Sequence, residues 1–262
     1  MAGGAAYVTG VPNAPAVGID ALLRGAVRPF ARGQASAIDK RPVDDEVEIG
    51  ASGLAGDAQA DRRHHGGPDK AVHYYPRDHY RAWSVELAVK GTNATGEGPS
   101  SRAALLSRPG AFGENVSTTG LTKSDVCVGD LWQLGTALLE VSQARQPCWK
   151  LDERFGVPGM ARRVQATGRT GWYYRVREPG RARAGDALSL IERPHSEWPL
   201  SRILRAFYID RMDRPTLEGI AGLSVLAPSW RELARRRLAS GRVEDWSKRL
   251  RDDRTNRADR TN

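Results

Sequence analysis

The pattern of apolar residues changes along the chain, and this change limits the folds open to it. Between Ala35 and Ile191 the apolar runs are short, often alternate with polar residues, and are separated by Gly, Pro and Asp. Alternation is typical of strands with one buried face, and Gly, Pro and Asp end strands. From Trp198 the apolar residues recur three and four positions apart, as on one face of a helix. We therefore expect a β-rich α+β protein followed by a small helical domain.

Within the β-rich part, two similar segments each place a Gly-Asp turn before an alternating strand. They are residues 128–134 and 184–190, and residues 136–142 are expected to form a hairpin with the first. Helices are inserted as well, most clearly after Pro76, where three large apolar residues share one helical face: Tyr80, Trp83 and Leu87.

The C-terminal part predicts three helices and a short fourth one. The first two carry apolar stripes, the third begins at Pro228 and ends at Gly241, and the last contains Val243, Trp246 and Leu250. The stripes comprise Leu200, Ile203, Leu204 and Phe207, then Leu217, Ile220 and Ala221. We expect a flexible leader over residues 1–17, the β-rich domain over 18–191, the helical domain over 192–251 and a disordered tail over 252–262.

Composition narrows the function classes. The formal net charge is +9, but basic residues are interspersed with acidic ones, which favours a solvated surface over a nucleic-acid site. No apolar run reaches the roughly 18 residues of a membrane helix, and no signal peptide opens the chain. We expect a cytoplasmic protein with no membrane partner. The two cysteines, Cys127 and Cys148, are expected to be free thiols.

Cys148 lies in the segment with the most distinctive chemistry, Ser142-Gln-Ala-Arg-Gln-Pro-Cys148-Trp-Lys-Leu151. The cysteine follows a predicted strand, in a loop stiffened by Pro147, and the cations Arg145 and Lys150 favour its thiolate form. A thiolate binds metals or attacks electrophiles. Spacing alone, however, favours a structural role for both cysteines, as small buried apolar side chains.

A second polar segment, His64-His-Gly-Gly-Pro-Asp69-Lys-Ala, precedes a strand ending at Tyr75. Its two glycines let the backbone approach an anion, and His65, Asp69 and Lys70 add directional polar groups. A plain polar turn fits the same residues. His73 and His79 are expected to be ordinary packing or surface residues.

A third segment, Phe112-Gly-Glu-Asn115, places Asn115 at a glycine turn. Its amide can hydrogen-bond a heterocycle or the backbone, or the residue can serve only to form the tight turn. The sequence has no phosphate-binding loop of the Walker type, dinucleotide-binding fingerprint or serine-hydrolase elbow.

Together these segments resemble the YiiM-type proteins of the MOSC-domain family. The resemblance extends from Ser36-Ala-Ile-Asp-Lys40 through Gly53-Leu-Ala-Gly-Asp57 and Gly168-Arg-Thr-Gly-Trp172-Tyr-Tyr to the last helices, which are similar to the three-helix domain of this subgroup. It implies a mostly β barrel whose loops hold a molybdenum cofactor (molybdopterin), with Cys148 as the protein ligand to the metal.

The resemblance also implies individual roles. Arg145 and Lys70 would contact the cofactor's phosphate and Asn115 its pterin. The residues expected to bind the cofactor are His65, Gly66, Gly67, Asp69, Lys70, Asn115, Arg145 and Lys40. The residues expected to be catalytic are Cys148, His65 and Asp57. The proton would come either from Asp57, acting as an acid, or from a water held by His65.

The implied reaction is the two-electron reduction of an N-hydroxylated substrate, such as an N-hydroxylaminopurine, with electrons delivered by a separate reductase. The protein is expected to be a monomer or a dimer. One alternative is a cofactor carrier or sulfur-transfer protein without turnover of an organic substrate. A third is a nucleic-acid-binding module built on the basic run Arg235–Arg242, although that run lacks a recognition-helix pattern.

Overall fold

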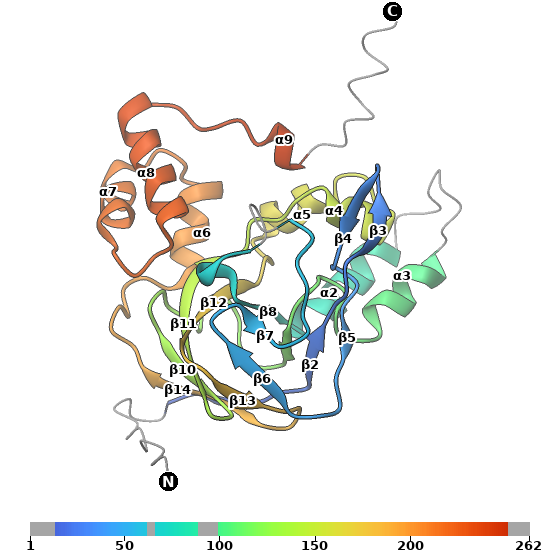
Figure 1. Ribbon diagram of the computed structural model, residues 1–262. Helices are drawn as coiled ribbons and strands as arrows, with labels where there is room; N and C mark the ends of the chain where they lie inside the picture. Colours follow the sequence, from blue (N-terminus) through green and yellow to red (C-terminus); the bar gives the residue numbers. More distant parts are fainter. Residues whose placement is uncertain (1–13, 62–65, 89–98, 251–262) are drawn as a thin grey trace, which may run out of the picture.

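A curved nine-stranded sheet forms the framework of the protein (Figure 1). The computed structural model describes residues 14–61, 66–88 and 99–250. All neighbouring strands pair antiparallel except β8 and β9, which are parallel. In spatial order the strands are β1 (Ala16–Gly18), β14 (Ala187–Glu192), β10 (Leu131–Leu134), β11 (Ala137–Ala144), β12 (Trp172–Glu178), β8 (Val72–Pro76), β9 (Val116–Thr118), β2 (Ala21–Arg24) and β5 (Arg41–Pro42).

The sheet bends so far that consecutive segments of the chain reach its two ends. β1 pairs with β14 at one end, and after only two residues the chain continues as β2, which pairs with β9 near the other end. Within the described ranges no ladder joins the outermost strands β1 and β5, so the closed barrel stays a prediction. Two smaller sheets complete the β structure, β13 (Gly180–Ala182) with β6 (Val47–Gly50) and β7 (Gly53–Leu54), and β3 (Arg28–Ala31) with β4 (Gln34–Ser36).

Helices are inserted between the strands, as the sequence predicts, and one of them is located by the sequence itself. The predicted helix after Pro76 is confirmed as α2 (Asp78–Ala88), with Tyr80, Trp83 and Leu87 all buried. The predicted hairpin is confirmed as β10 and β11. The other inserted helices are α3 (Pro99–Leu106), α4 (Lys150–Phe155), α5 (Met160–Thr167) and the short 3-10 helix η1 (Pro68–Lys70).

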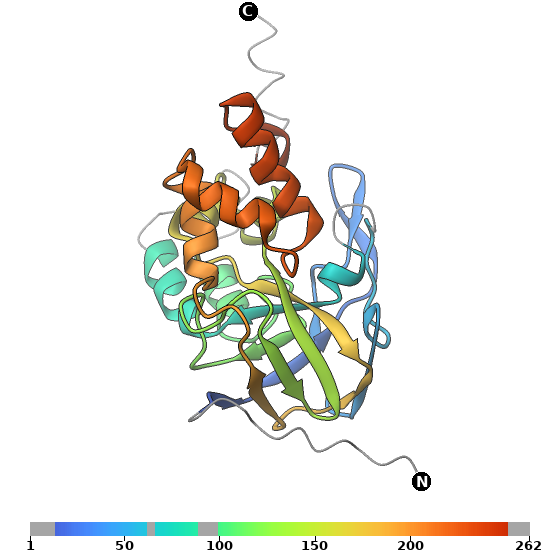
Figure 2. The same ribbon diagram turned by 90° about the vertical axis from the view of Figure 1, so that its left-hand side faces the viewer.

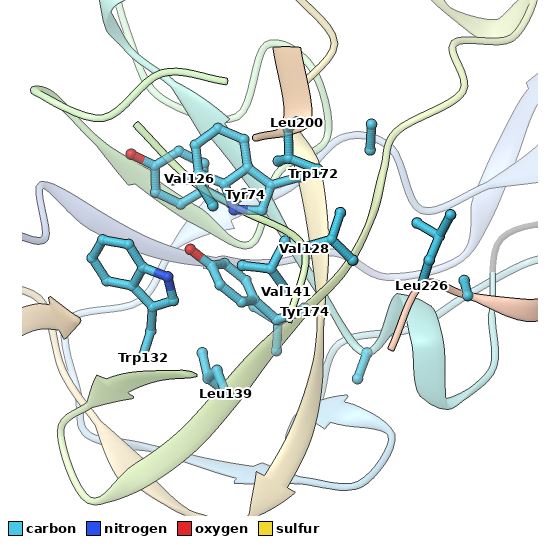
Figure 3. Packing of buried hydrophobic residues seen from close by; sticks show 14 of the residues in the cluster. Tyr74, Val126, Val128, Trp132, Leu139, Val141, Trp172, Tyr174, Leu200 and Leu226 are labelled. Atoms are coloured by element: carbon cyan, nitrogen blue, oxygen red, sulfur yellow. The ribbon is translucent and has the colours of Figure 1, made fainter. Parts of the chain in front are cut away.

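The three main C-terminal helices, which the sequence predicts, are α6 (Leu200–Tyr208), α7 (Arg214–Gly222) and α8 (Pro228–Ser240). Figure 2 shows these helices, in orange and red, above the strands. Their apolar faces join the core of the sheet, because one continuous cluster contains strand residues such as Trp132 and helix residues such as Leu200 and Trp230. Figure 3 shows this packing around Tyr174 and Trp172. The helical part therefore shares its core with the sheet.

The basic run Arg235–Arg242 belongs to this helical part, and one of its four arginines is buried while the other three are exposed. Arg237 is 1% exposed, and its guanidinium donates to both carboxylate oxygens of Glu244, at 2.8 and 2.7 Å. Because a central cation of the run is neutralised inside the protein, the run offers fewer phosphate contacts than its sequence indicates. The nucleic-acid alternative stays an untested prediction.

The ends of the predicted domains are only partly visible. β1 begins at Ala16, inside the predicted leader, while residues 1–13 and the predicted tail 252–262 lie outside the described residues. The last helix, α9 (Ser247–Leu250), leaves the α6–α8 group and lies near α4 and α5 (Figure 1). No helix in the described part of the chain has the length and apolar character that a membrane crossing requires.

Candidate functional site

The cysteine of the distinctive segment lies in a short loop between β11 and α4. The loop is held at its start by the backbone N–H of Arg145, which donates to Gly171 O at 3.0 Å, and at its end by the N–H of Leu151, which donates to Cys148 O at 3.0 Å. Cys148 is a free thiol and is partly exposed. Cys127, in contrast, is buried beside Pro199, as a structural role predicts.

Two cavities meet at this thiol. The inner cavity, of about 90 Å³, extends toward Lys40 and Asn115, whereas the outer cavity, of about 540 Å³, extends toward α8 and α9. Both cavities are lined by Asp61, Lys70, Cys148, Lys150 and Tyr173. The thiol therefore borders a narrow charged cavity and a second cavity large enough for a small organic molecule.

A buried group of three polar residues forms one wall of the inner cavity. The Lys40 ammonium forms an ion pair with the Asp57 carboxylate, and the two side chains are only 8% and 5% exposed. Asp57 also accepts hydrogen bonds from Asn115 Nδ2 at 2.8 Å and from the Gly25 N–H at 2.8 Å. Burial lowers the pKa of Lys40, and the attraction of Asp57 opposes this effect. The carboxylate thus holds both Lys40 and Asn115 in position.

Arg145 gives the inner cavity its clearest sign of an anionic ligand. The residue is 6% exposed and lines the cavity, yet its Nη1 has no hydrogen-bond partner among the described residues. A buried guanidinium nitrogen without a partner is costly, and a bound phosphate or carboxylate would satisfy it. Lys70 adds a second cation to the cavity lining. Burial lowers the pKa of Lys70, and attraction to Asp69, Asp61 and Cys148 opposes this effect.

Most of the predicted site residues lie together. The inner cavity is lined by Lys40, Asp57, Lys70, Asn115, Arg145 and Cys148. The Asn115 amide also binds the backbone: its Oδ1 accepts from the His73 N–H at 3.0 Å, and its Nδ2 donates to Leu23 O at 3.1 Å. The fold therefore uses Asn115 to join β2 and β8 at the cavity wall.

The remaining predicted residues lie elsewhere. The Asp69 carboxylate accepts two hydrogen bonds from Arg175, at 2.8 and 2.6 Å, and Asp69 does not line either cavity. Gly66 and Gly67 precede η1, and neither glycine is among the residues described as lining the two cavities. The backbone of Gly67 has a φ of +94°, a conformation that favours glycine, which explains the residue at this position. His65 lies outside the described residues.

Several site residues are missed by sequence reasoning. His73, expected to be an ordinary packing or surface residue, is buried in the cavity wall, where its ring lies 4.9 Å from the Tyr173 ring. Burial raises the pKa of Tyr173 despite the opposing effect of Arg145, so the phenol keeps its proton. No local sequence pattern marks the C-terminal residues that line the outer cavity as site residues. They are Ser229, Trp230, Lys248 and Arg249. The Trp172-Tyr-Tyr part of the resemblance is the one pattern that points to Tyr173.

Arg249 of α9 fixes the cysteine loop from both sides of Cys148. Its carbonyl accepts a hydrogen bond from the Trp149 N–H at 2.9 Å, while its guanidinium donates to Pro147 O and, at 2.6 Å, to Gln165 Oε1. The neighbouring Leu250 is buried in the same apolar cluster as residues of α4 and α5. A residue about 100 positions away thus positions the thiol.

We expect Arg249→Ala to loosen this loop. Loss of the guanidinium leaves Pro147 O and Gln165 without their donor, so alkylation of Cys148 by a small reagent should accelerate about tenfold. The measurement is a time course of modification followed by mass spectrometry of the Cys148 peptide. Arg242→Ala removes an exposed cation of the same segment and should leave the rate unchanged. Equal rates in all three proteins would contradict the positioning role.

Comparisons with known proteins agree with this architecture. The model of the MOSC domain matches residues 61–189, and that of the YiiM-like, 3-alpha helix domain matches residues 198–241. Protein YiiM of Escherichia coli (strain K12) is 37% identical over 229 residues, which are 87% of this chain and 96% of that protein. A protein named Reductase from Gibberella moniliformis is 40% identical over 175 residues, which are 65% of this chain but 29% of that protein.

The fold is likewise similar to solved structures. The crystal structure of YiiM from Geobacillus stearothermophilus matches with a TM-score of 0.67 at 33% identity, over 86% of this chain and all of that one. The structure of YiiM from Escherichia coli matches with a TM-score of 0.68 at 33% identity, over 87% of this chain and 99% of that one.

Proposed function

The chain belongs to the MOSC-domain family, in its YiiM-like branch with a three-helix domain, and from this premise we propose that it is a molybdenum-cofactor-dependent reductase of N-hydroxylated compounds such as N-hydroxylaminopurines. The observation that carries the proposal is the position of the Cys148 thiol at the junction of two cavities, one of them lined by buried cations. A soft thiolate ligand beside an anion-binding wall suits a metal held by a phosphorylated organic cofactor.

The residues present fit this cofactor. The Cys148 sulfur would be the protein's ligand to the metal. Arg145, with its unsatisfied Nη1, and Lys70 would bind the phosphate. Lys40 and Asn115, which line the same cavity, would also border the cofactor, held in position by Asp57. When bound, the cofactor would supply the two-electron redox chemistry that none of these side chains provides.

The overall reaction would convert R–NH–OH, two electrons and two protons to R–NH₂ and water, with the electrons arriving from a separate reductase. The sequence offers Asp57 and a water held by His65 as proton sources. Asp57 forms an ion pair with Lys40 and accepts two further hydrogen bonds, so its contacts suit positioning of Lys40 and Asn115 better than proton delivery. The cytoplasmic location and the monomeric or dimeric state remain predictions.

The test is a measurement of molybdenum, pterin and turnover in protein produced in a host that makes the cofactor. We expect close to one molybdenum per chain and reduction of an N-hydroxylaminopurine with an artificial electron donor. Molybdenum bound without reduction would favour the carrier or sulfur-transfer alternative. Absence of both molybdenum and pterin from the purified protein would reject the cofactor assignment.

A further inference from the structure

We propose that a surface groove lined by Arg24, Arg28 and Arg41 docks a small acidic electron-transfer protein, which supplies the electrons of the reaction. This inference rests on the proposed function, because it names the kind of partner that the same site needs. The groove has a volume of about 550 Å³ and lies between the ends of β2 and β7, the start of β3, and β5. Its described lining shares no residue with either cavity at Cys148.

The position of this arginine groove is the first argument, because it shares a wall with the inner cavity. Asp39 and Arg41 line the groove, while Lys40 between them lines the cavity. The N–H of Gly25, another groove residue, donates to Asp57 Oδ1 in the cavity wall at 2.8 Å. A single layer of chain thus separates the groove from the proposed cofactor. Electron transfer slows steeply with distance, so a donor docked at this thin wall is well placed.

The groove also leaves the way to the thiol open. The outer cavity extends toward α8 and α9, whereas β2 and β5 lie away from α7 and α8 (Figure 1). A donor protein docked over the outer cavity would cover the entrance that a small substrate needs. A donor in the arginine groove can be bound at the same time as the substrate.

The charge of the groove favours an acidic partner. Arg24 and Arg28 are exposed, and neither has a carboxylate partner among the residues that the structure describes. Arg24 Nη1 donates only to the neutral Ala55 O, at 3.4 Å. Arg41 pairs at 2.9 Å with Asp39, the one acid of the described lining. Three arginines against one acid leave two positive charges, which steer an acidic protein toward the groove.

Asp39 does not neutralise the groove, because other arginines share it. Its carboxylate also lies 3.2 Å from Arg154 Nη2 and 3.9 Å from Arg108 Nη2. Burial raises the pKa of Asp39, but Arg154 and Arg41 outweigh this effect and hold the pKa below its ordinary value. The acidic residues 44–46 follow β5 and stand outside the described lining.

An exposed apolar side chain accompanies these cations. Val27, directly before Arg28, is 47% exposed. Protein interfaces combine apolar contacts with arginine, and the interfaces of electron-transfer complexes are small. A groove with a few arginines and one exposed valine suits such a short-lived contact.

The binding experiment uses a plant-type ferredoxin as the acidic redox protein. Binding of oxidised ferredoxin to the cofactor-loaded protein is measured by titration calorimetry at low ionic strength. We expect Arg24→Glu/Arg28→Glu to weaken binding at least about tenfold, and added salt to weaken binding to the unmodified protein. The control Arg214→Glu/Arg235→Glu makes the same change of net charge at exposed residues of α7 and α8 and should retain the affinity.

Turnover gives a second readout. With limiting reduced ferredoxin as donor, Arg24→Glu/Arg28→Glu should reduce an N-hydroxylaminopurine at least about tenfold more slowly than the unmodified protein. With reduced methyl viologen, a small donor that needs no docking surface, the two rates should be equal, which also shows that the variant is folded. A saturating concentration of the N-hydroxylaminopurine should not displace ferredoxin.

Three results would overturn the proposal: no binding of ferredoxin, equal weakening in the groove variant and its control, or displacement of ferredoxin by the substrate. Tighter binding of a short DNA duplex than of ferredoxin, lost in the groove variant, would assign the arginines to nucleic acid instead. A protein that binds ferredoxin in the groove but reduces nothing with methyl viologen would reject the proposed function and support the docking surface. Reduction with methyl viologen without ferredoxin binding would do the reverse.

Discussion

Replacing Cys148 with alanine is expected to lower molybdenum retention and N-hydroxylaminopurine reduction by roughly 100-fold or more. Loss of an outer-shell partner of a metal ligand already costs about 10- to 100-fold in affinity or activity, and removal of the ligand itself should cost at least as much. The partly exposed thiol contributes little to the core, so the fold should persist. Metal analysis, pterin fluorescence and turnover of purified protein measure the effect.

Cys127→Ala is the matched control, because it removes the other thiol of the chain from a buried position that lines neither cavity. It should lower thermal stability modestly while retaining molybdenum and activity. If Cys148→Ala kept its molybdenum and its turnover, the thiol would not be the metal ligand and the proposed mechanism would fail.

Replacing Asp57 with alanine is expected to destabilise the protein by about 3–5 kcal/mol, because it leaves the Lys40 ammonium buried without its partner. The Gly25 N–H and one N–H of Asn115 lose their acceptor as well. Denaturant unfolding monitored by tryptophan fluorescence measures the change in the free energy of unfolding. The same variant should weaken cofactor retention, since Lys40 and Asn115 lose the group that holds them at the cavity wall.

An exposed ion pair is the control for this experiment. Glu218→Ala removes the partner of Arg214, whose side chain is 64% exposed, and should change the free energy of unfolding by less than about 1 kcal/mol. In the double variant Lys40→Met/Asp57→Leu no buried charge is left unpaired, so its loss should be smaller than the sum of the single losses. A cost for Asp57→Ala no larger than that of Glu218→Ala would show that the pair is solvated rather than buried.

The sequence by itself determined the elements and much of the candidate site. Helix α2 was predictable because Tyr80, Trp83 and Leu87 recur at helical spacing, and the β10–β11 hairpin because alternating residues flank a short turn. These are local signals, since backbone periodicity decides which residues face the core. The resemblance to the MOSC-domain family, carried by short motifs, implied site residues of which Lys40, Asp57, Asn115 and Cys148 share one cavity.

Only the tertiary structure decided how distant segments meet. Asp69 stands in a promising motif, but the fold turns its carboxylate to Arg175, more than 100 positions along the chain. Arg249 looks like an ordinary residue of a charged helix, and becomes part of the site because the last segment packs against the loop of Cys148. Such contacts depend on which elements pack together, and the periodicity within one element carries no information about its partner in another.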